Sequence, residues 1–358
     1  MTDLPEAAGL ENNTGVDPNR RHFLKKATGL AAATLAPPIL SLPNRSRAAA
    51  ASQRLKLAIS LPERHPISMG LQTACADILQ ESRGRLAIEV FANGELGSDT
   101  DTISQVRAGA IDFLSTAGLV WGTLVPVASV SVTAFAFPDY PTVWKAMDGE
   151  LGAHVRAAFA AVNLEPMTRL WDHGFRHITM AARPIDSPQG LVGAKIRVPM
   201  SPMLISQFRA LGAAPTSINY SELYTALQTH IVDGQENPLS LVEAGKLYEV
   251  QRYCSLTAHA WDGFWLCANQ QSWHRLPGDL REIAARNFDS HALKERSANA
   301  ELNSTLLKTL QSRGMTLNTV DPGPWRKVLQ KTGYYHDWKQ RLGAHTWDLL
   351  EKYSGALL

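Results

Sequence analysis

The chain has 358 residues, of which 45% are hydrophobic and 19% charged, a globular composition with length enough for two ordinary domains. Its formal net charge is +2, and residues 1–50 alone carry a net +2. The remainder is therefore close to neutral and gives no electrostatic reason to expect a nucleic-acid partner. Beyond residue 50, no stretch approaches the roughly 20 apolar residues of a membrane-spanning helix, so we expect a body that does not span a membrane.

The first fifty residues have the pattern of an export signal. Arg20 and Arg21 precede Phe23, an apolar segment follows from residue 27 to 42, and small residues at 48–50 suit a signal peptidase. The paired arginines resemble a twin-arginine signal, although an ordinary Sec signal or a disordered basic tail has a similar composition. We predict that residues 1–50 are a twin-arginine leader and that the protein is periplasmic.

Beyond the leader, strand and helix patterns alternate. In chain order the first elements are a strand at 55–61, a helix at 66–84, a strand at 86–91, a helix that breaks at Gly109 and a strand at 111–115. This β-α-β-α-β order predicts an open, mainly parallel sheet covered by helices on both faces. Ligands of such sheets bind in the crevice outside the carboxyl ends of the strands.

A second unit of the same kind follows. Its predicted elements are a strand at 195–199, a helix at 202–211, a strand at 217–220, a helix at 221–228 with Ser221 as N-cap, a strand from 231, and two strands at 254–259 and 264–268. From Pro277 apolar residues recur at helical spacing, with no proline until Pro322. A helix of that length predicts a brace across two domains.

Motifs for catalysis and metal binding are missing from the sequence. It contains no G-x-S-x-G, H-E-x-x-H, Walker A or G-x-G-x-x-G pattern. His173 and His177 are four apart but fall in a loop or strand, where that spacing does not make a metal pair. We predict a protein that is not an enzyme and needs no metal or cofactor.

The three cysteines, Cys75, Cys254 and Cys267, have no metal or redox spacing. Cys254 and Cys267 flank one predicted turn and could pair in an oxidising compartment. The alternative is that all three are buried as small apolar side chains.

Several motifs carry a resemblance to one family. They are GELG at 94–97, WDHGFR at 171–176, KIRVP at 195–199, ELYTALQ at 222–228, VDGQENP at 232–238 and Leu276-Pro277 before the long helix. Over its whole length after the leader, the chain resembles the DctP-type substrate-binding proteins of tripartite ATP-independent periplasmic (TRAP) transporters. One departure is His230, where that family usually has glycine.

The resemblance implies an α/β, two-lobed clamshell of the periplasmic-binding-protein kind, with mixed, mainly parallel sheets flanked by helices and a long bracing helix near the C-terminus. The expected domain ranges are 51–175 for the first part of domain I, 176–262 for the first part of domain II, 263–300 for the return to domain I and the start of the brace, and 301–358 for the closing helices of domain II.

The resemblance also implies that Arg197 is the main clamp for a ligand carboxylate. A guanidinium is planar, permanently charged and matched to a carboxylate by two parallel hydrogen bonds. Arg176 and Asn237 match further family positions that contact the ligand, Arg176 from the neighbouring strand. Structural roles compete with each assignment: a salt bridge at a sheet edge for Arg197, a solvated arginine for Arg176, and a turn residue before Pro238 for Asn237.

Five further residues are candidates for the pocket walls. His65 and Glu95 fall in the first two β-to-α loops, and Trp171, Trp261 and Phe264 could stack on an apolar part of the ligand. Each of them is nearly as compatible with an ordinary core position.

The predicted function is capture of a small organic acid, a C4-dicarboxylate or a sugar acid by the resemblance, for the membrane subunits of a TRAP transporter. A ligand-sensing periplasmic domain would use the same clamshell. An exported enzyme acting on an organic acid would need a nucleophile or an acid–base pair in the crevice, and only unpaired candidates exist.

Overall fold

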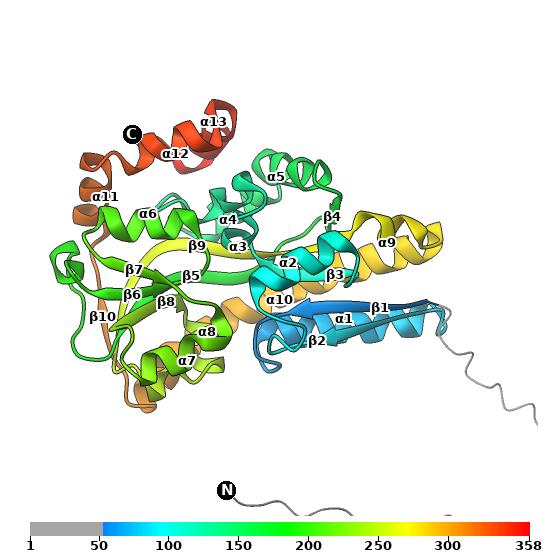
Figure 1. Cartoon of the computed structure of the whole chain (residues 1–358), viewed down its shortest axis with the longest axis horizontal. Helices are drawn as coiled ribbons and strands as arrows, with labels where there is room; N and C mark the ends of the chain where they lie inside the picture. Colours follow the sequence, from blue (N-terminus) through cyan, green and yellow to red (C-terminus); the bar gives the residue numbers. More distant parts are fainter. Residues whose placement is uncertain (1–52) are drawn as a thin grey trace, which may run out of the picture. The chain divides into compact units, whose positions relative to one another are not determined.

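The computed structural model describes residues 53–358 (Figure 1), so the predicted leader lies outside the described residues. The strands of this part are β1 (Gln53–Ile59), β2 (Leu86–Phe91), β3 (Phe113–Ala117), β4 (Leu164–Pro166), β5 (Trp171–Met180), β6 (Lys195–Val198), β7 (Ala214–Ser217), β8 (Gly234–Pro238), β9 (Tyr253–Asn269) and β10 (Thr316–Thr319). No helix among the described residues is long and apolar enough to cross a membrane.

The helices cover both faces of the strands. They are α1 (Pro66–Glu81), α2 (Asp99–Ala108), α3 (Gly118–Trp121), α4 (Tyr140–Met147), α5 (Glu150–Ala160), α6 (Pro202–Ala210), α7 (Tyr220–Gln228), α8 (Leu239–Ala244), α9 (Gln270–Arg275), α10 (Gly278–Ser312), α11 (Pro322–Lys331), α12 (Tyr334–Leu342) and α13 (Ala344–Ser354), with short 3-10 turns at Pro126–Val132, Pro188–Leu191 and Leu247–Glu249. Helix α1 packs on α10, α12 contacts α6, and α13 contacts α4 and α5.

One mixed sheet runs through the described residues in the order β2-β1-β3-β9-β5-β8-β6-β7, with β4 and β10 paired to β9. Strands β1, β2 and β3 are parallel to one another at one end, and β6, β7 and β8 are parallel at the other. The two long strands between them, β5 and β9, are antiparallel to each other. The predicted α/β fold with a mixed sheet is confirmed, with its two halves joined by these crossing strands (Figure 1).

Strand β9 corrects one prediction. The sequence predicted two strands, at 254–259 and 264–268, whereas the structure has one strand of 17 residues. Its pairing with β5 shifts register twice, and Ala258 adopts a left-handed φ of 44°. These irregularities bend the strand without ending it, because a bulge inserts an extra residue while pairing resumes on either side.

Two further predictions were displaced by a few residues. Helix α7 has Asn219 as its N-cap, and Ser221 lies inside the first turn. The strand predicted at 217–220 is β7, which ends at Ser217. The misplaced helix start has a simple cause: serine is favoured at N-caps but is also tolerated within the first helical turn, so its identity alone does not mark the boundary.

The long helix α10 connects two separate hydrophobic clusters. Leu280 and Phe288, near its start, belong to the larger cluster, whereas Leu306 and Leu310, near its end, belong to the smaller one. The predicted bracing helix is therefore confirmed over Gly278–Ser312.

Cys75, Cys254 and Cys267 are free and buried, so the disulfide considered between Cys254 and Cys267 is absent and the alternative of three buried thiols is confirmed.

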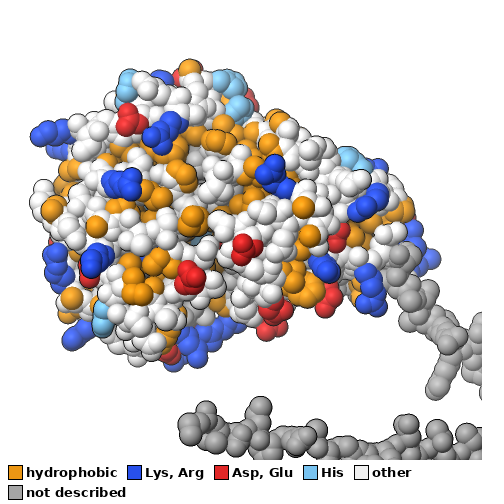
Figure 2. Space-filling model, in the orientation of Figure 1, with side chains coloured by type: hydrophobic (Ala, Val, Ile, Leu, Met, Phe, Trp, Pro, Cys, Tyr) orange, Lys and Arg blue, Asp and Glu red, His pale blue; other side chains and the backbone are white. Residues whose placement is uncertain are grey.

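The surface fits the near-neutral charge of this part of the chain. Figure 2 shows basic and acidic side chains interspersed over one face.

Candidate functional site

A pocket lined mostly by buried side chains lies where the two halves of the sheet meet. One half contributes Ser60, Asp99 and Thr116, the other half contributes Arg197, Tyr220 and Asn237, and the crossing strands contribute His173, Arg176 and Phe264. The remaining lining residues are Leu61, Ala117, Leu119, Val120, Pro199 and Leu241. Apolar walls with a few converging polar groups are typical of small-molecule sites.

The strand ends explain why polar side chains converge here. Ser60 directly follows β1, Thr116 is next to the last residue of β3, and Arg197 and Asn237 are next to the last residues of β6 and β8. In parallel sheets the carboxyl ends of the strands lie at the same edge, and ligands bind outside that edge. The cavity occupies the position that the strand order predicted.

Arg197 is a buried cation with no acidic side chain in direct contact among the described residues, although the charges of Glu236 and Asp99 act on it from a longer distance. Its side chain is 1% exposed, and its Nε donates to the backbone oxygen of Ile218 at 2.8 Å. Within residues 53–358 it forms no ion pair. Burial lowers the pKa of Arg197 to about 10, which still leaves the guanidinium charged at neutral pH. A buried charge is costly unless it is paired, so the cavity is suited to an anion.

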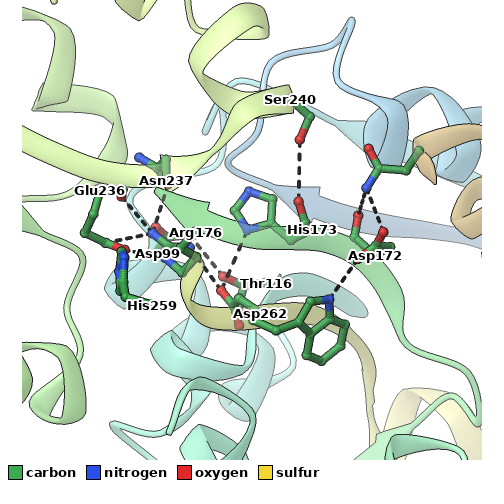
Figure 3. Close-up of polar contacts among 12 residues, drawn as sticks. Asp99, Thr116, Asp172, His173, Arg176, Glu236, Asn237, Ser240, His259 and Asp262 are labelled. Carbon is green, nitrogen blue, oxygen red and sulfur yellow. Dashed lines mark hydrogen bonds and ion pairs between the residues drawn. The ribbon is translucent and has the colours of Figure 1, made fainter. Parts of the chain in front are cut away.

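Arg176 is equally buried but fully paired with acidic groups of the protein (Figure 3). Its Nε and Nη2 donate to the two carboxylate oxygens of Glu236 at 2.5 and 2.8 Å, and its Nη1 lies 3.3 Å from Asp262 Oδ2. Burial raises the pKa of Glu236, but the charge of Arg176 and the hydrogen bond of His259 outweigh it and hold this pKa at about 2. The family resemblance predicted Arg176 on the strand next to that of Arg197. This was wrong, because β8 lies between β5, which carries Arg176, and β6, which carries Arg197.

Asn237 connects this ion-pair network to the cavity. Its Oδ1 accepts a hydrogen bond from Arg176 Nη2 at 3.0 Å, and its Nδ2 donates to Gln235 Oε1 at 2.5 Å. The oxygen and the nitrogen of the Asn237 side-chain amide are thus both hydrogen-bonded, which holds the amide in a fixed orientation near the end of β8. Phe264, 2% exposed, adds an apolar wall.

Two lining residues have polar atoms directed to this region that the sequence analysis did not select. Asp99, 8% exposed at the start of α2, accepts a hydrogen bond from Thr116 Oγ1 at 3.2 Å. His173, 3% exposed on β5, has no hydrogen-bond partner for either ring nitrogen among the described residues, because its closest acidic neighbour, Asp262 Oδ2, is 3.7 Å from Nδ1. Burial and the nearby charge of Arg176 hold the pKa of His173 well below its usual range, so the imidazole is neutral.

Four predicted wall residues are not among those that line the cavity. Glu95 is exposed. His65 is buried, caps α1 by accepting from the Ile67 N–H, and lies 5.6 Å from the His173 ring. The Trp171 ring packs on α1 so closely that a Cβ at Gly70 would lie 2.5 Å from it.

The fourth of these residues, Trp261, belongs to the core. Its Nε1 donates to Asp172 at 3.0 Å, and its ring makes edge contacts with Phe137 and Trp144. The sequence alone does not show whether an aromatic residue near a strand end lines a ligand pocket or packs in the core, because both environments are apolar.

Some signal for the missed residues was present. Asp99 follows the GELG turn and begins a helix with a capping box formed by Ser98 and Asp101. In sequence, an acidic residue at a helix start is ordinarily explained by the helix dipole. His173 precedes Gly174 in a motif that the family resemblance had already singled out, but without a metal-ligand spacing its identity predicted no role.

Comparison with protein families gives one match that spans most of the chain. The family model DctP, described as bacterial extracellular solute-binding protein, family 7, matches residues 57–337. This range contains every residue named above as lining the cavity.

Two curated relatives illustrate the similarity. The chain is 34% identical over 277 residues to the uncharacterised protein y4mM of Sinorhizobium fredii, covering 77% of this chain and 50% of that protein. It is 30% identical over 244 residues to the 2,3-diketo-L-gulonate-binding periplasmic protein YiaO of Escherichia coli, covering 68% of this chain and 74% of the relative. The chain thus spans only half the length of the first relative.

A solved structure shows the same fold. The TRAP periplasmic solute-binding protein of Sulfurospirillum deleyianum, determined with bound succinate, superposes with a TM-score of 0.80 at 26% identity, covering 85% of this chain and 99% of the other.

Proposed function

Because the chain belongs to bacterial extracellular solute-binding protein family 7, the DctP family, we propose that it captures a small organic acid in the cavity between the two halves of its sheet. We further propose that it delivers this acid to the membrane subunits of a TRAP transporter. Relatives support the ligand class: one is named for binding 2,3-diketo-L-gulonate and another holds succinate. The protein acts in this proposal as a binding protein, without turning over its ligand.

The observation that carries the proposal is the unpaired charge of Arg197. This guanidinium is 1% exposed, lines the cavity and has no acidic partner within residues 53–358. A ligand carboxylate would supply the missing countercharge through two parallel hydrogen bonds. Exclusion of water around the pair would strengthen it, because Coulomb interactions grow as the local dielectric constant falls.

Closure of two lobes around the ligand is part of the same proposal. The lobes correspond to domain I (51–175 with 263–300) and domain II (176–262 with 301–358), and their relative motion would open the cavity. The export signal predicted at residues 1–50 supports a periplasmic location and the twin-arginine route. Relatives are named as periplasmic proteins.

A thermal-shift panel tests the proposal. The purified protein, refolded after removal of any bound ligand, is heated with dicarboxylates, sugar acids, keto acids and aromatic acids, each beside its neutral amide. A ligand that binds only the folded state stabilises it by about 2.7 kcal/mol at one hundred times its dissociation constant. We expect an increased melting temperature with at least one acid and none with its amide.

The variant Arg197→Ala is the specific control. It is expected to keep its fold, as judged by circular dichroism, and to lose the response to the acid. An acid that binds the variant as tightly as the unmodified protein would contradict the carboxylate clamp, and a panel without any responding acid would contradict the proposed function.

A further inference from the structure

The walls of the cavity offer positive charge for one carboxylate and not for two. Arg197 has no acidic partner within residues 53–358, whereas the guanidinium of Arg176 is bonded to both oxygens of Glu236 and lies 3.3 Å from Asp262. All of these side chains are at most 1% exposed. Glu236, whose pKa is held at about 2, already supplies the countercharge of Arg176, whereas burial raises the pKa of Asp262 to about 7. Arg197 is therefore the arginine left to neutralise a ligand carboxylate.

An acidic side chain occupies another wall of the same cavity. Asp99 is 8% exposed and accepts a hydrogen bond from Thr116 Oγ1 at 3.2 Å. Burial raises the pKa of its carboxyl group, whereas the hydrogen bonds of Ser60 and Thr116 and the charge of Arg197 favour its ionised form. An ionised carboxylate only accepts hydrogen bonds. A second ligand carboxylate in this cavity would meet a like charge when Asp99 is ionised, whereas a ligand hydroxyl would donate a hydrogen bond to it.

His173 supplies the complementary group. Its imidazole lines the cavity between Phe264, whose ring lies 4.8 Å away, and Asp262, and among the described residues both of its nitrogens lack a hydrogen-bond partner. A neutral imidazole has one donor and one acceptor, and a hydroxyl group has both as well. Leaving both nitrogens buried without a partner is costly, so a hydroxylated ligand would satisfy them.

We propose that the cavity selects acids with a single carboxylate and several hydroxyl groups, and that Asp99 and His173 are the residues that discriminate against dicarboxylates. This inference rests on the proposed function and narrows its ligand class. Arg197 binds the carboxylate, Asp99 accepts from a ligand hydroxyl, and His173 binds a hydroxyl as donor or acceptor.

Isothermal titration calorimetry with matched ligand pairs tests the inference on the full-length protein. Galactonate and galactarate differ only in whether the far end is a hydroxymethyl group or a carboxylate, and 4-hydroxybutanoate and succinate differ in the same way. Only the pair that binds more tightly is compared. In that pair we expect the monocarboxylate (galactonate or 4-hydroxybutanoate) to bind about 100-fold more tightly than its dicarboxylate (galactarate or succinate), because the second carboxylate opposes a like charge. This comparison needs no variant.

Two variants assign the discrimination to residues. Asp99→Asn removes the like charge and is expected to reduce the preference for galactonate over galactarate at least tenfold. His173→Leu is expected to weaken galactonate at least tenfold while leaving the affinity for unsubstituted butanoate within threefold. Glu89→Gln, an exposed substitution on β2, is the matched control and should change neither value.

The outcomes separate the two proposals. If succinate or galactarate binds as tightly as its hydroxylated partner, and the amides do not bind, the narrower ligand class is wrong while acid capture stands. If no carboxylate binds the folded, ligand-stripped protein, acid capture and the narrower inference both fail. Unchanged selectivity in Asp99→Asn and His173→Leu would overturn their assignment as the discriminating residues.

Discussion

At the scale of single residues, the two cavity arginines differ in what surrounds them. Both are buried, but Arg176 forms ion pairs with Glu236 and Asp262, whereas Arg197 forms none within residues 53–358. The Nε of Arg197 donates to the carbonyl of Ile218, and the charges of Glu236 and Asp99 act on it from a longer distance. Removing one partner of a buried ion pair leaves the other charge stranded, while removing an unpaired buried charge does not. The stability of the ligand-free protein should therefore distinguish them.

We expect Arg176→Met to lower the free energy of unfolding by about 3–5 kcal/mol, because it leaves buried carboxylates without a countercharge. Arg197→Met should change it by no more than about 1 kcal/mol, the net worth of one hydrogen bond. Urea denaturation of the two variants, which are matched in residue type, measures both values. Equal destabilisation by the two substitutions would show that Arg197 has a structural partner.

The same comparison shows how far the sequence could locate the site. The motif around residue 197 identified an arginine at a strand end, and Arg197, Arg176, Asn237 and Phe264 all line the cavity. Ligand contact by any of them stays a prediction. The motif could not show which arginine is already paired, since Glu236 and Asp262 are 60 and 86 residues from Arg176 in the chain.

At the scale of elements, helix α10 is tied to strand β5 by two buried carboxyl groups. Glu295 Oε2 accepts from the Asp172 backbone N–H at 2.8 Å, and the Asp172 carboxylate accepts from Asn299 Nδ2 at 2.9 Å and from Trp261. Burial raises the pKa of Asp172 to about 6 and that of Glu295 well above its usual range. The two acidic groups thus oppose each other at the contact between brace and sheet.

This contact predicts a pH dependence of stability. A native pKa above the unfolded value means that the native state holds the proton more strongly, so the contribution of such a group to stability falls as pH rises from about 4 towards its native pKa. Glu295→Gln removes one charge and retains an oxygen for the Asp172 N–H. We expect the variant to be more stable than the unmodified protein at pH 8 by about 1–2 kcal/mol, with the difference shrinking towards pH 4.

Chemical denaturation across this pH range measures the difference. Glu301→Gln, an exposed substitution on the same helix, is the control and should show no such pH-dependent gain. If Glu295→Gln were less stable than the unmodified protein at pH 8, the charge of Glu295 would be compensated in the native state.

At the scale of the whole molecule, residues 53–358 are held together by elements that belong to both halves. The 17-residue strand β9 pairs with β3 from one half and with the crossing strand β5, and α10 has buried residues in both hydrophobic clusters. A boundary between cooperative units would have to cut these elements, which would expose their buried surfaces to water.

We therefore expect differential scanning calorimetry to show one cooperative transition, with a calorimetric enthalpy equal to the van't Hoff enthalpy. A bound acid should raise its midpoint without splitting it, because the ligand contacts both halves. Arg197→Ala is the control that should show the single transition without the ligand-induced increase. Two resolved transitions would mean that β9 and α10 do not couple the halves.

By itself, the sequence determined the α/β class, the bracing helix and an arginine at a strand end, because periodicity, helix length and short motifs are local properties of the chain. Only the tertiary structure decided that β9 is one bent strand, that Trp171 and Trp261 pack away from the cavity, and that Asp99 and His173 line it. It also decided that Arg176 is paired with acidic groups and that Arg197 forms no ion pair within residues 53–358. Burial and charge pairing depend on residues brought together from distant strands, and no local pattern encodes those distances.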